Sequence, residues 1–156
     1  MLLLFILIAV NSQPGFQTGT MIWMADGSCK PIENVVRGDL IMTELSDRIL
    51  SNETVIGLDQ TLNPYFILTI KTWKWTITSG KDQKFYVWDD ETSEAKCLAG
   101  GSFRIPYGIT YIYSIETIQF PLTNLYYLFV NNTNNYFVSS ELKCSENYDS
   151  LFLVNN

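Results

Sequence analysis

The chain offers several nucleophilic side chains but contains no histidine to activate them. The hydroxyl and thiol candidates near its two ends are Ser12, Thr18, Thr20 and Cys144. Without an imidazole, Ser-His-Asp and Cys-His catalysis are excluded, and a catalytic zinc site would lack its commonest ligand. Thr18 or Thr20 could act as a nucleophile only with another general base. We therefore treat both threonines as weak candidates and interpret Thr20 as a strand residue.

The three cysteines, Cys29, Cys97 and Cys144, can form at most one intramolecular disulfide. None stands in a CxxC spacing, so we expect no metal centre, and nothing in the sequence indicates a cofactor. We interpret Cys144 as paired with Cys29 or Cys97, or simply buried, rather than catalytic. A carboxylate group formed by Asp26, Glu33 and Asp39 is better explained by turn chemistry and ion pairs than by acid–base work.

Composition limits the partners. The net charge is −6 and the Lys and Arg residues are scattered singly, which disfavours nucleic acid because no row of phosphate contacts is offered. With 47% apolar and 17% charged residues, the 156-residue chain is large enough to bury a core. We expect a monomer whose partner, if it has one, is a protein that the sequence does not identify.

The first ten residues form an uninterrupted apolar run that ends at Asn11. A bilayer-spanning helix takes roughly 20 residues, so this run is too short, and the small Ser12 suits the last position before a cleavage site. We predict a signal peptide over residues 1–12, a single domain over 13–156, and a secreted or luminal protein. The alternatives are a buried first strand or an uncleaved anchor. Asn52 and Asn131 begin N-glycosylation sequons.

Short apolar and alternating runs separated by turn residues predict an all-β fold of many short strands and hairpins. Residues 89–96 are charged, and we expect a solvated loop or short helical turn there. Within the alternating run 73–78, Trp73 and Trp75 could form a ligand platform, but we interpret them as core residues. The expected strands are 20–24, 40–42, 54–58, 65–72, 73–78, 85–88, 109–120, 126–130 and 135–138.

The first strand is followed by an Asp26-Gly27 turn, an extended return over residues 30–33, and a turn at residues 37–39. Strand, turns and the next strand together resemble the opening of the Hint domain, the module of inteins and hedgehog autoprocessing domains. In that family a nucleophilic Cys stands four residues before the Gly-Thr pair, here Gly19-Thr20. That position is Gly15 in this chain.

A middle motif of the family, Thr-x-x-His before an aromatic strand, resembles residues 80–87. Aligned on the aromatic strand, Gly80 occupies the threonine position and Gln83 the histidine position. A two-residue slip would instead place Thr78 and Lys81 there. The closing hairpin resembles residues 126–138, after which the usual spacing places the terminal His-Asn pair at Cys144 and Ser145. A second register, at Asn155 and Asn156, needs about ten extra residues, so we prefer the first.

The resemblance implies self-cleavage, in which the Cys thiol attacks the preceding carbonyl and the middle Thr and His activate the bond. Glycine offers no attacking atom, and glutamine cannot carry a proton near neutral pH. We therefore expect a Hint-like domain with a degenerate active site, acting as a non-catalytic scaffold or binding module. The alternative is self-cleavage through a substitute nucleophile such as Cys144 or Thr18.

Overall fold

The computed structural model describes residues 12–87, 91–98, 100–141, 144 and 148–155. Within that part the chain forms two antiparallel sheets linked by short turns, and it contains no helix of seven or more residues. No helix of the described chain has the length and apolar character that crossing a membrane requires. The expected all-β fold is confirmed.

The larger sheet has eight strands in the order β10-β11-β6-β7-β1-β12-β5-β4, and the smaller has six in the order β3-β2-β13-β14-β8-β9. The strands of the first half are β1 (Phe16–Gln17), β2 (Met21–Trp23), β3 (Cys29–Pro31), β4 (Leu40–Glu44), β5 (Leu50–Thr61), β6 (Phe66–Thr72) and β7 (Thr76–Gly80). Those of the second half are β8 (Lys84–Tyr86), β9 (Thr92–Glu94), β10 (Ser102–Ile105), β11 (Gly108–Gln119), β12 (Leu125–Val130), β13 (Asn135–Ser139) and β14 (Leu151–Asn155).

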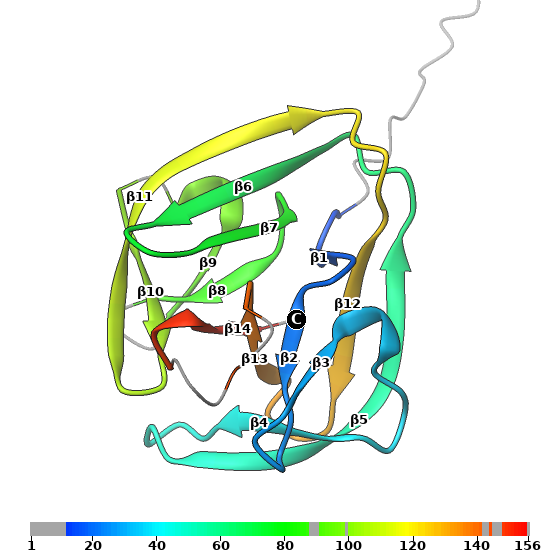
Figure 1. Ribbon diagram of the computed structural model, residues 1–156, viewed down its shortest axis with the longest axis vertical. Coiled ribbons are helices and arrows are strands. Elements are labelled where there is room, and N and C mark those ends of the chain that lie inside the picture. Colours follow the sequence, from blue (N-terminus) through cyan, green and yellow to red (C-terminus); the bar gives the residue numbers. More distant parts are fainter. Residues whose placement is uncertain (1–11, 88–90, 99, 142–143, 145–147, 156) are drawn as a thin grey trace, which may run out of the picture.

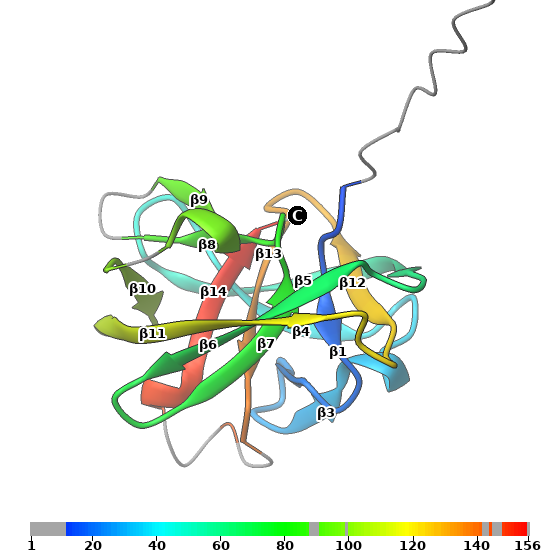
Figure 2. The ribbon, with the colours of Figure 1, turned by 90° about the horizontal axis from the view of Figure 1, so that it is seen from above.

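Two long strands, β5 and β11, carry the larger sheet around the outside of the molecule (Figures 1 and 2). Each of them pairs with two neighbours: β5 with β4 and β12, and β11 with β6 and β10. The register shifts between Ile112 and Ser114 and between Phe129 and Val130. Such bulges bend a strand and increase its twist, which suits the curved course of these strands.

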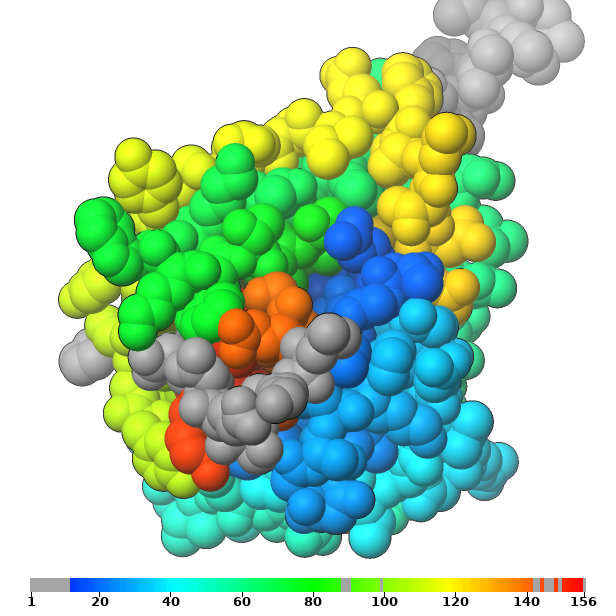
Figure 3. Space-filling model, in the orientation of Figure 1, coloured from blue at the N-terminus to red at the C-terminus, as the bar shows by residue number. Residues whose placement is uncertain are grey.

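The N-terminal strand β1 is inserted between β7 and β12, where Phe16 pairs with both Ser79 and Tyr126. In the space-filling view this segment lies between the β6–β7 hairpin and β12 (Figure 3). The Phe16 side chain is fully buried and meets the ring of Phe85 edge-on at 5.8 Å. Phe85 continues the aromatic core through Phe103, at a ring separation of 4.6 Å. Strand β1 is thus part of the core.

The predicted strand 73–78 is partly wrong, because its first residues form the β6–β7 turn. Thr72 closes this turn by donating its backbone N–H to the Trp75 carbonyl at 2.8 Å. Trp73 projects from the turn with 85% of its surface exposed, whereas Trp75 packs against the core. The core interpretation therefore fails for Trp73 and holds for Trp75. Gly80, expected in a turn, is the last residue of β7.

Two further expectations need correction. The charged segment 89–96 was expected as a loop or short helical turn. Part of it forms strand β9, whereas its end lies in a short 3-10 helix, Ala95–Cys97, in agreement with the helical turn; residues 88–90 lie outside the described chain. The end of the extended return 30–33 is a short 3-10 turn, Ile32–Asn34. The closing strand β14 was not among the expected strands, yet it pairs with β13 over its whole length and with β8 at its end.

Cys29 and Cys144 form a disulfide with their Cα atoms 5.5 Å apart, and Cys97 is free and exposed.

The turn interpretation of two carboxylates is confirmed. Asp26 accepts hydrogen bonds from the Ser28 N–H and hydroxyl, and Asp39 accepts the Val36 N–H and pairs with Lys30.

Candidate functional site

The Gln83 side chain joins the two ends of the described fold. It is fully buried, and its Oε1 accepts the Gly15 N–H at 2.8 Å. Its Nε2 donates to the carbonyl oxygens of Lys84 at 3.0 Å and Asn155 at 2.9 Å. Gln83 holds this position because it stands immediately before β8, which pairs with the end of β14. The structure therefore brings Gly15, Gln83 and Asn155 together.

Gly15 has a backbone conformation and surroundings that exclude a side chain. Its φ is +106°, a value that L side chains rarely adopt. A Cβ atom at this position would lie 2.8 Å from the carbonyl oxygen of Tyr126 in β12. The Gly15 carbonyl in turn accepts the Gly80 N–H at 2.8 Å. The position that the resemblance assigns to the nucleophile is therefore shaped for glycine.

Gly80 is excluded from carrying a side chain even more strongly. A Cβ atom there would lie 1.9 Å from the carbonyl oxygen of Gln13 and 2.9 Å from the side chain of Leu125. A threonine hydroxyl at this position is sterically impossible unless the Gln13 segment moves away. In the alternative alignment, the hydroxyl of Thr78 lies 3.4 Å from that of Thr69, and Lys81 is engaged by Asp82. Gln83, not Lys81, contacts Gly15.

The end of the chain brings the second register of the closing motif to this place. Asn155, the first residue of that register, contacts Gln83, and Cys144 lies in a disulfide elsewhere. The Asn155 side chain donates to the hydroxyl of Tyr86 at 3.1 Å. Cys144 is buried in its disulfide, in a second apolar cluster that includes Trp23 and Phe137. Its sulfur is bonded and is not available as a thiolate.

The remaining predicted positions lie away from Gln83 or outside the described residues. Thr18 is exposed in the turn after β1, and Thr20 is buried just before β2. The Thr20 carbonyl accepts the Ile32 N–H at 2.8 Å, consistent with a structural role. The carboxylate of Glu33, attributed above to turn chemistry or an ion pair, accepts the Gly19 N–H at 2.9 Å. Ser145 and Asn156 lie outside the described residues.

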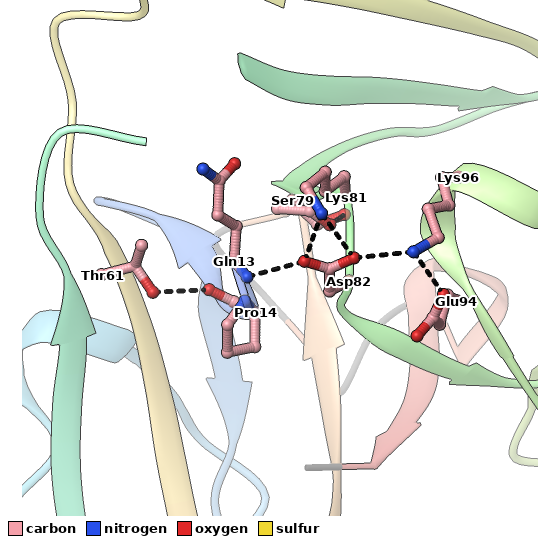
Figure 4. Close-up of polar contacts among 9 residues, drawn as sticks. Gln13, Pro14, Thr61, Ser79, Lys81, Asp82, Glu94 and Lys96 are labelled. Atoms are coloured by element: carbon pink, nitrogen blue, oxygen red, sulfur yellow. Dashed lines mark hydrogen bonds and ion pairs between the residues drawn. The ribbon is translucent and has the colours of Figure 1, made fainter. Parts of the chain in front are cut away.

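A charged cluster beside Gln83 holds the segment that precedes Gly15 (Figure 4). The Asp82 carboxylate accepts the Gln13 N–H at 2.8 Å and pairs with Lys81 at 2.7 Å and Lys96 at 2.9 Å. Burial by itself would raise the pKa of Asp82, but the hydrogen bonds from Lys81, the Gln13 N–H and Lys96 outweigh it and lower the pKa. Lys96 also pairs with Glu94. Asp82 is therefore ionised and structural at neutral pH.

Two more contacts fix the backbone at Gln13 and Pro14. The Asp82 N–H donates to the Gln13 carbonyl at 3.3 Å, and the Thr61 hydroxyl donates to the Pro14 carbonyl at 3.2 Å. In the self-cleavage that the resemblance implies, the Pro14 carbonyl would be the point of attack. Here it faces a single hydroxyl donor, and the next residue carries no nucleophile.

The site as built binds backbone groups through Gln83. Its central side chain is an amide, which does not titrate near neutral pH. Among the described residues no group of three or more His, Cys, Asp or Glu side chains is arranged to bind a metal ion.

A cavity of about 600 Å³ adjoins the site on the side of Tyr86. Arg104 and Glu44 form a buried ion pair in its wall, and Asn135 binds the backbone of Glu44 through both its amide oxygen and nitrogen. The Thr133 hydroxyl, also in the wall, is buried without a hydrogen-bond partner. These polar groups lie beside the apolar side chains of Leu45 and Leu153, so the wall is mixed, as in many small-ligand pockets.

The sequence motifs pointed to Gly15, Gly80 and Gln83, and Asn155 belonged to the less favoured register of the closing motif. No motif pointed to Asp82. The Gln13–Asp82 contact joins residues 69 positions apart, and the Gln83–Asn155 contact joins residues 72 positions apart. The continuous apolar run of residues 151–154, which follows the hairpin strand 135–138, was a signal for a buried pairing strand.

Solved structures of inteins resemble this fold over nearly its whole length. The bacterial intein-like domain from Clostridium thermocellum matches with a TM-score of 0.79 and 24% identity, covering 93% of this chain and 100% of that chain. The DnaB intein from Synechocystis sp. PCC 6803 matches with a TM-score of 0.70 and 15% identity, covering 91% and 97%. The gp41-1 intein matches with a TM-score of 0.69 and 15% identity, covering 93% and 100%.

No protein-family model and no curated protein sequence matches the chain. The structural likeness shows the fold: this is the Hint fold of inteins, as the sequence motifs predicted.

Proposed function

We propose that this chain is a secreted Hint-like domain without autoprocessing activity, retained as a stable β scaffold that binds a protein partner. The observation that supports the proposal most directly is the Gln83 side chain. The resemblance assigns this position to the family's histidine, and here the Gln83 side chain makes three hydrogen bonds to backbone groups of Gly15, Lys84 and Asn155. A group that activates a peptide bond is thus replaced by one that holds the chain in place.

The packing around Gly15 and Gly80 supports the same conclusion. At either position a side chain would fit only if neighbouring backbone atoms moved. A Cβ would lie 2.8 Å from a carbonyl oxygen at Gly15 and 1.9 Å from one at Gly80. Restoring the missing nucleophile and threonine would therefore require repacking of β1, β7 and β12. In this proposal the backbone packing at both positions, and not only the absence of two side chains, accounts for the loss of activity.

Self-cleavage through a substitute nucleophile is the weaker alternative. The sulfur of Cys144 is in a disulfide, and Thr18 and Thr20 lie between β1 and β2, beyond the Pro14–Gly15 bond in the chain.

Three features support secretion. The Cys29–Cys144 disulfide suits an oxidising compartment. Asn52 and Asn131, the two sequon asparagines, are both exposed. The apolar run of residues 1–10 is typical of a signal peptide. For binding, the cavity beside Tyr86 is the part of the surface where we expect a polar side chain of a partner to enter.

Intact mass spectrometry of the purified mature chain tests the loss of activity. The protein is kept for a day at neutral pH with and without a thiol and hydroxylamine, which resolve a thioester or ester. We expect an unchanged mass in every condition. Cleavage near residue 15 or near the chain end, accelerated by either nucleophile, would overturn the proposal and would identify the reacting residue by the cut position.

Gly15→Cys is the matched variant for the same assay. We expect it to remain uncleaved, because Gln83 still cannot carry a proton to the departing amine. Thiol-dependent cleavage between residues 14 and 15 in this variant would show that the remaining machinery is competent.

A further inference from the structure

The backbone nitrogen of Gln13 donates to the carboxylate of Asp82 (Figure 4). Gln13 is half-buried, and its carbonyl accepts the Asp82 N–H, whereas the preceding Ser12 is exposed. Gln13 is also the residue that the predicted signal cleavage would place first in the mature chain.

We propose that Asp82 is a capture site for the α-ammonium group of the mature N-terminus, created when the Ser12–Gln13 bond is cleaved. This inference rests on the proposed secretion. A secretory endopeptidase hydrolyses the amide with one water molecule. The water oxygen goes to the new Ser12 carboxylate, and the Gln13 nitrogen keeps the electrons of the broken bond and gains protons to become an ammonium.

The geometry for this ion pair is already present. The Gln13 nitrogen and the Asp82 Oδ2 atom are 2.8 Å apart, within the range of a charge-assisted hydrogen bond. The Asp82 side chain is 9% exposed, so the contact is largely shielded from solvent. An amide N–H that now donates to the carboxylate would be replaced by a charged donor at the same place.

The segment cannot swing away from Asp82 because the next residues are fixed as well. The Pro14 carbonyl accepts from Thr61, the Gly15 N–H donates to Gln83, and the Gly15 carbonyl accepts from Gly80. The amine is therefore held in position before the charge appears, which lowers the ordering cost of forming the pair.

The neighbouring charges limit the strength of the pair. Lys81 and Lys96 already share the Asp82 carboxylate, and Glu94 pairs with Lys96. Two cations and two anions make the cluster neutral, and the new ammonium would make it positive by one. We therefore expect a modest stabilisation of the fold. It should lower the unfolding equilibrium constant about five-fold, from the difference between neutral and charge-assisted hydrogen bonds.

A double-mutant cycle measures this gain. Residues 13–156 are prepared with a free Gln13 amine and with that amine acetylated, which restores a neutral amide N–H. Both forms are made with Asp82 and with Asp82→Asn, and urea unfolding is compared. Contacts of Asp82 with Lys81 and Lys96 are common to both forms and cancel. In the chain with Asp82, we expect acetylation to raise the unfolding equilibrium constant about five-fold. In the Asp82→Asn variant, acetylation should have little effect. Equal effects in both backgrounds would overturn the capture site.

A second measurement does not require the variant to fold. The acylation rate of the α-amine in the folded wild-type chain is compared with that in a peptide of residues 13–17. We expect at least a several-fold lower rate in the folded chain, and an equal rate would overturn the capture site. N-terminal sequencing of the full chain after expression in secreting cells tests the cleavage separately. A first residue other than Gln13 would overturn the maturation step, and an uncleaved chain would overturn the proposed secretion with it.

Discussion

The most informative single substitution is Gln83→Glu, which replaces one NH₂ group by an oxygen in a fully buried side chain. The acceptor for the Gly15 N–H survives the change. The Nε2 atom, which donates to the carbonyls of Lys84 and Asn155, is lost. An ionised carboxylate would instead turn a negative oxygen toward two carbonyl oxygens at about 3 Å.

The magnitude follows from the protonation state. A protonated Glu can still donate to one of the two carbonyls, so at low pH we expect a loss of about 1 kcal/mol, the value of one hydrogen bond. Burial and the facing carbonyls disfavour the charged form and should raise the pKa of this Glu from about 4.3 to about 7. That shift corresponds to about 4 kcal/mol, so the total loss at neutral pH is about 5 kcal/mol.

The direction of the pKa shift determines the pH range over which the Gln83→Glu variant loses stability. Because the folded state holds the proton more tightly than the unfolded state, the variant keeps its stability below about pH 4.3 and loses it as the pH rises to about 7. Urea unfolding from pH 3 to 8 measures this, with the exposed Gln119→Glu as the matched control. A Gln83→Glu deficit that does not change with pH would refute the buried, carbonyl-facing position of Gln83.

Three further predictions concern stability. Gly80→Ala should lower it by about 3 kcal/mol in urea unfolding, because the added Cβ meets a backbone carbonyl at 1.9 Å and backbone has to move. The pKa of Asp39 is lowered, chiefly by the hydrogen bond from Lys30, and that of Asp82 is lowered against the opposing effect of burial. Both carboxylates therefore contribute stability at neutral pH that is lost as the pH falls through their folded pKa values, and acid titration of the unfolding midpoint will show it. Reduction of the Cys29–Cys144 disulfide should lower stability by about 5 kcal/mol, because it opens a loop of 115 residues.

Each of these predictions has a control in the same chain. Gly108→Ala places a Cβ in open space, so it should change stability far less than Gly80→Ala. Asp82→Asn should flatten the acid limb of the titration, whereas the exposed Asp47→Asn should leave it unchanged. Cys97→Ser removes the free thiol and should retain full stability under oxidising conditions. Equal effects of target and control would contradict the structural assignment in each case.

The sequence predicted the all-β fold because short runs rich in aromatic and β-branched residues end at recognisable turns. The hairpin 126–138 is a clear case, with β12 and β13 observed where they were expected. The run 73–78 alternates large apolar and polar residues, yet its first half is a turn. The hydrogen bonds between Thr72 and Trp75 close that turn, and alternation alone cannot distinguish it from a strand.

The candidate site was predictable only where a motif carried it. Gly15 and Gln83 followed from spacing within their motifs, whereas Asn155 depended on the length of the segment between β13 and β14. About eleven residues intervene there, and the usual spacing of the closing motif gave no reason to expect them. Asp82 belongs to no motif, and its role depends on contacts with residues far along the chain.

The two anchor points of the described chain, Gln13 and Asn155, are held by the consecutive residues Asp82 and Gln83. Entry and exit are therefore close together in space, which is the geometry that a host protein needs in order to accept a foreign domain in one of its surface loops. Such an insertion would leave the host backbone almost undisturbed. The same proximity allows the ends to be joined by a short linker and reopened at an exposed turn, such as that at Trp73, to give a circular permutant of the same fold.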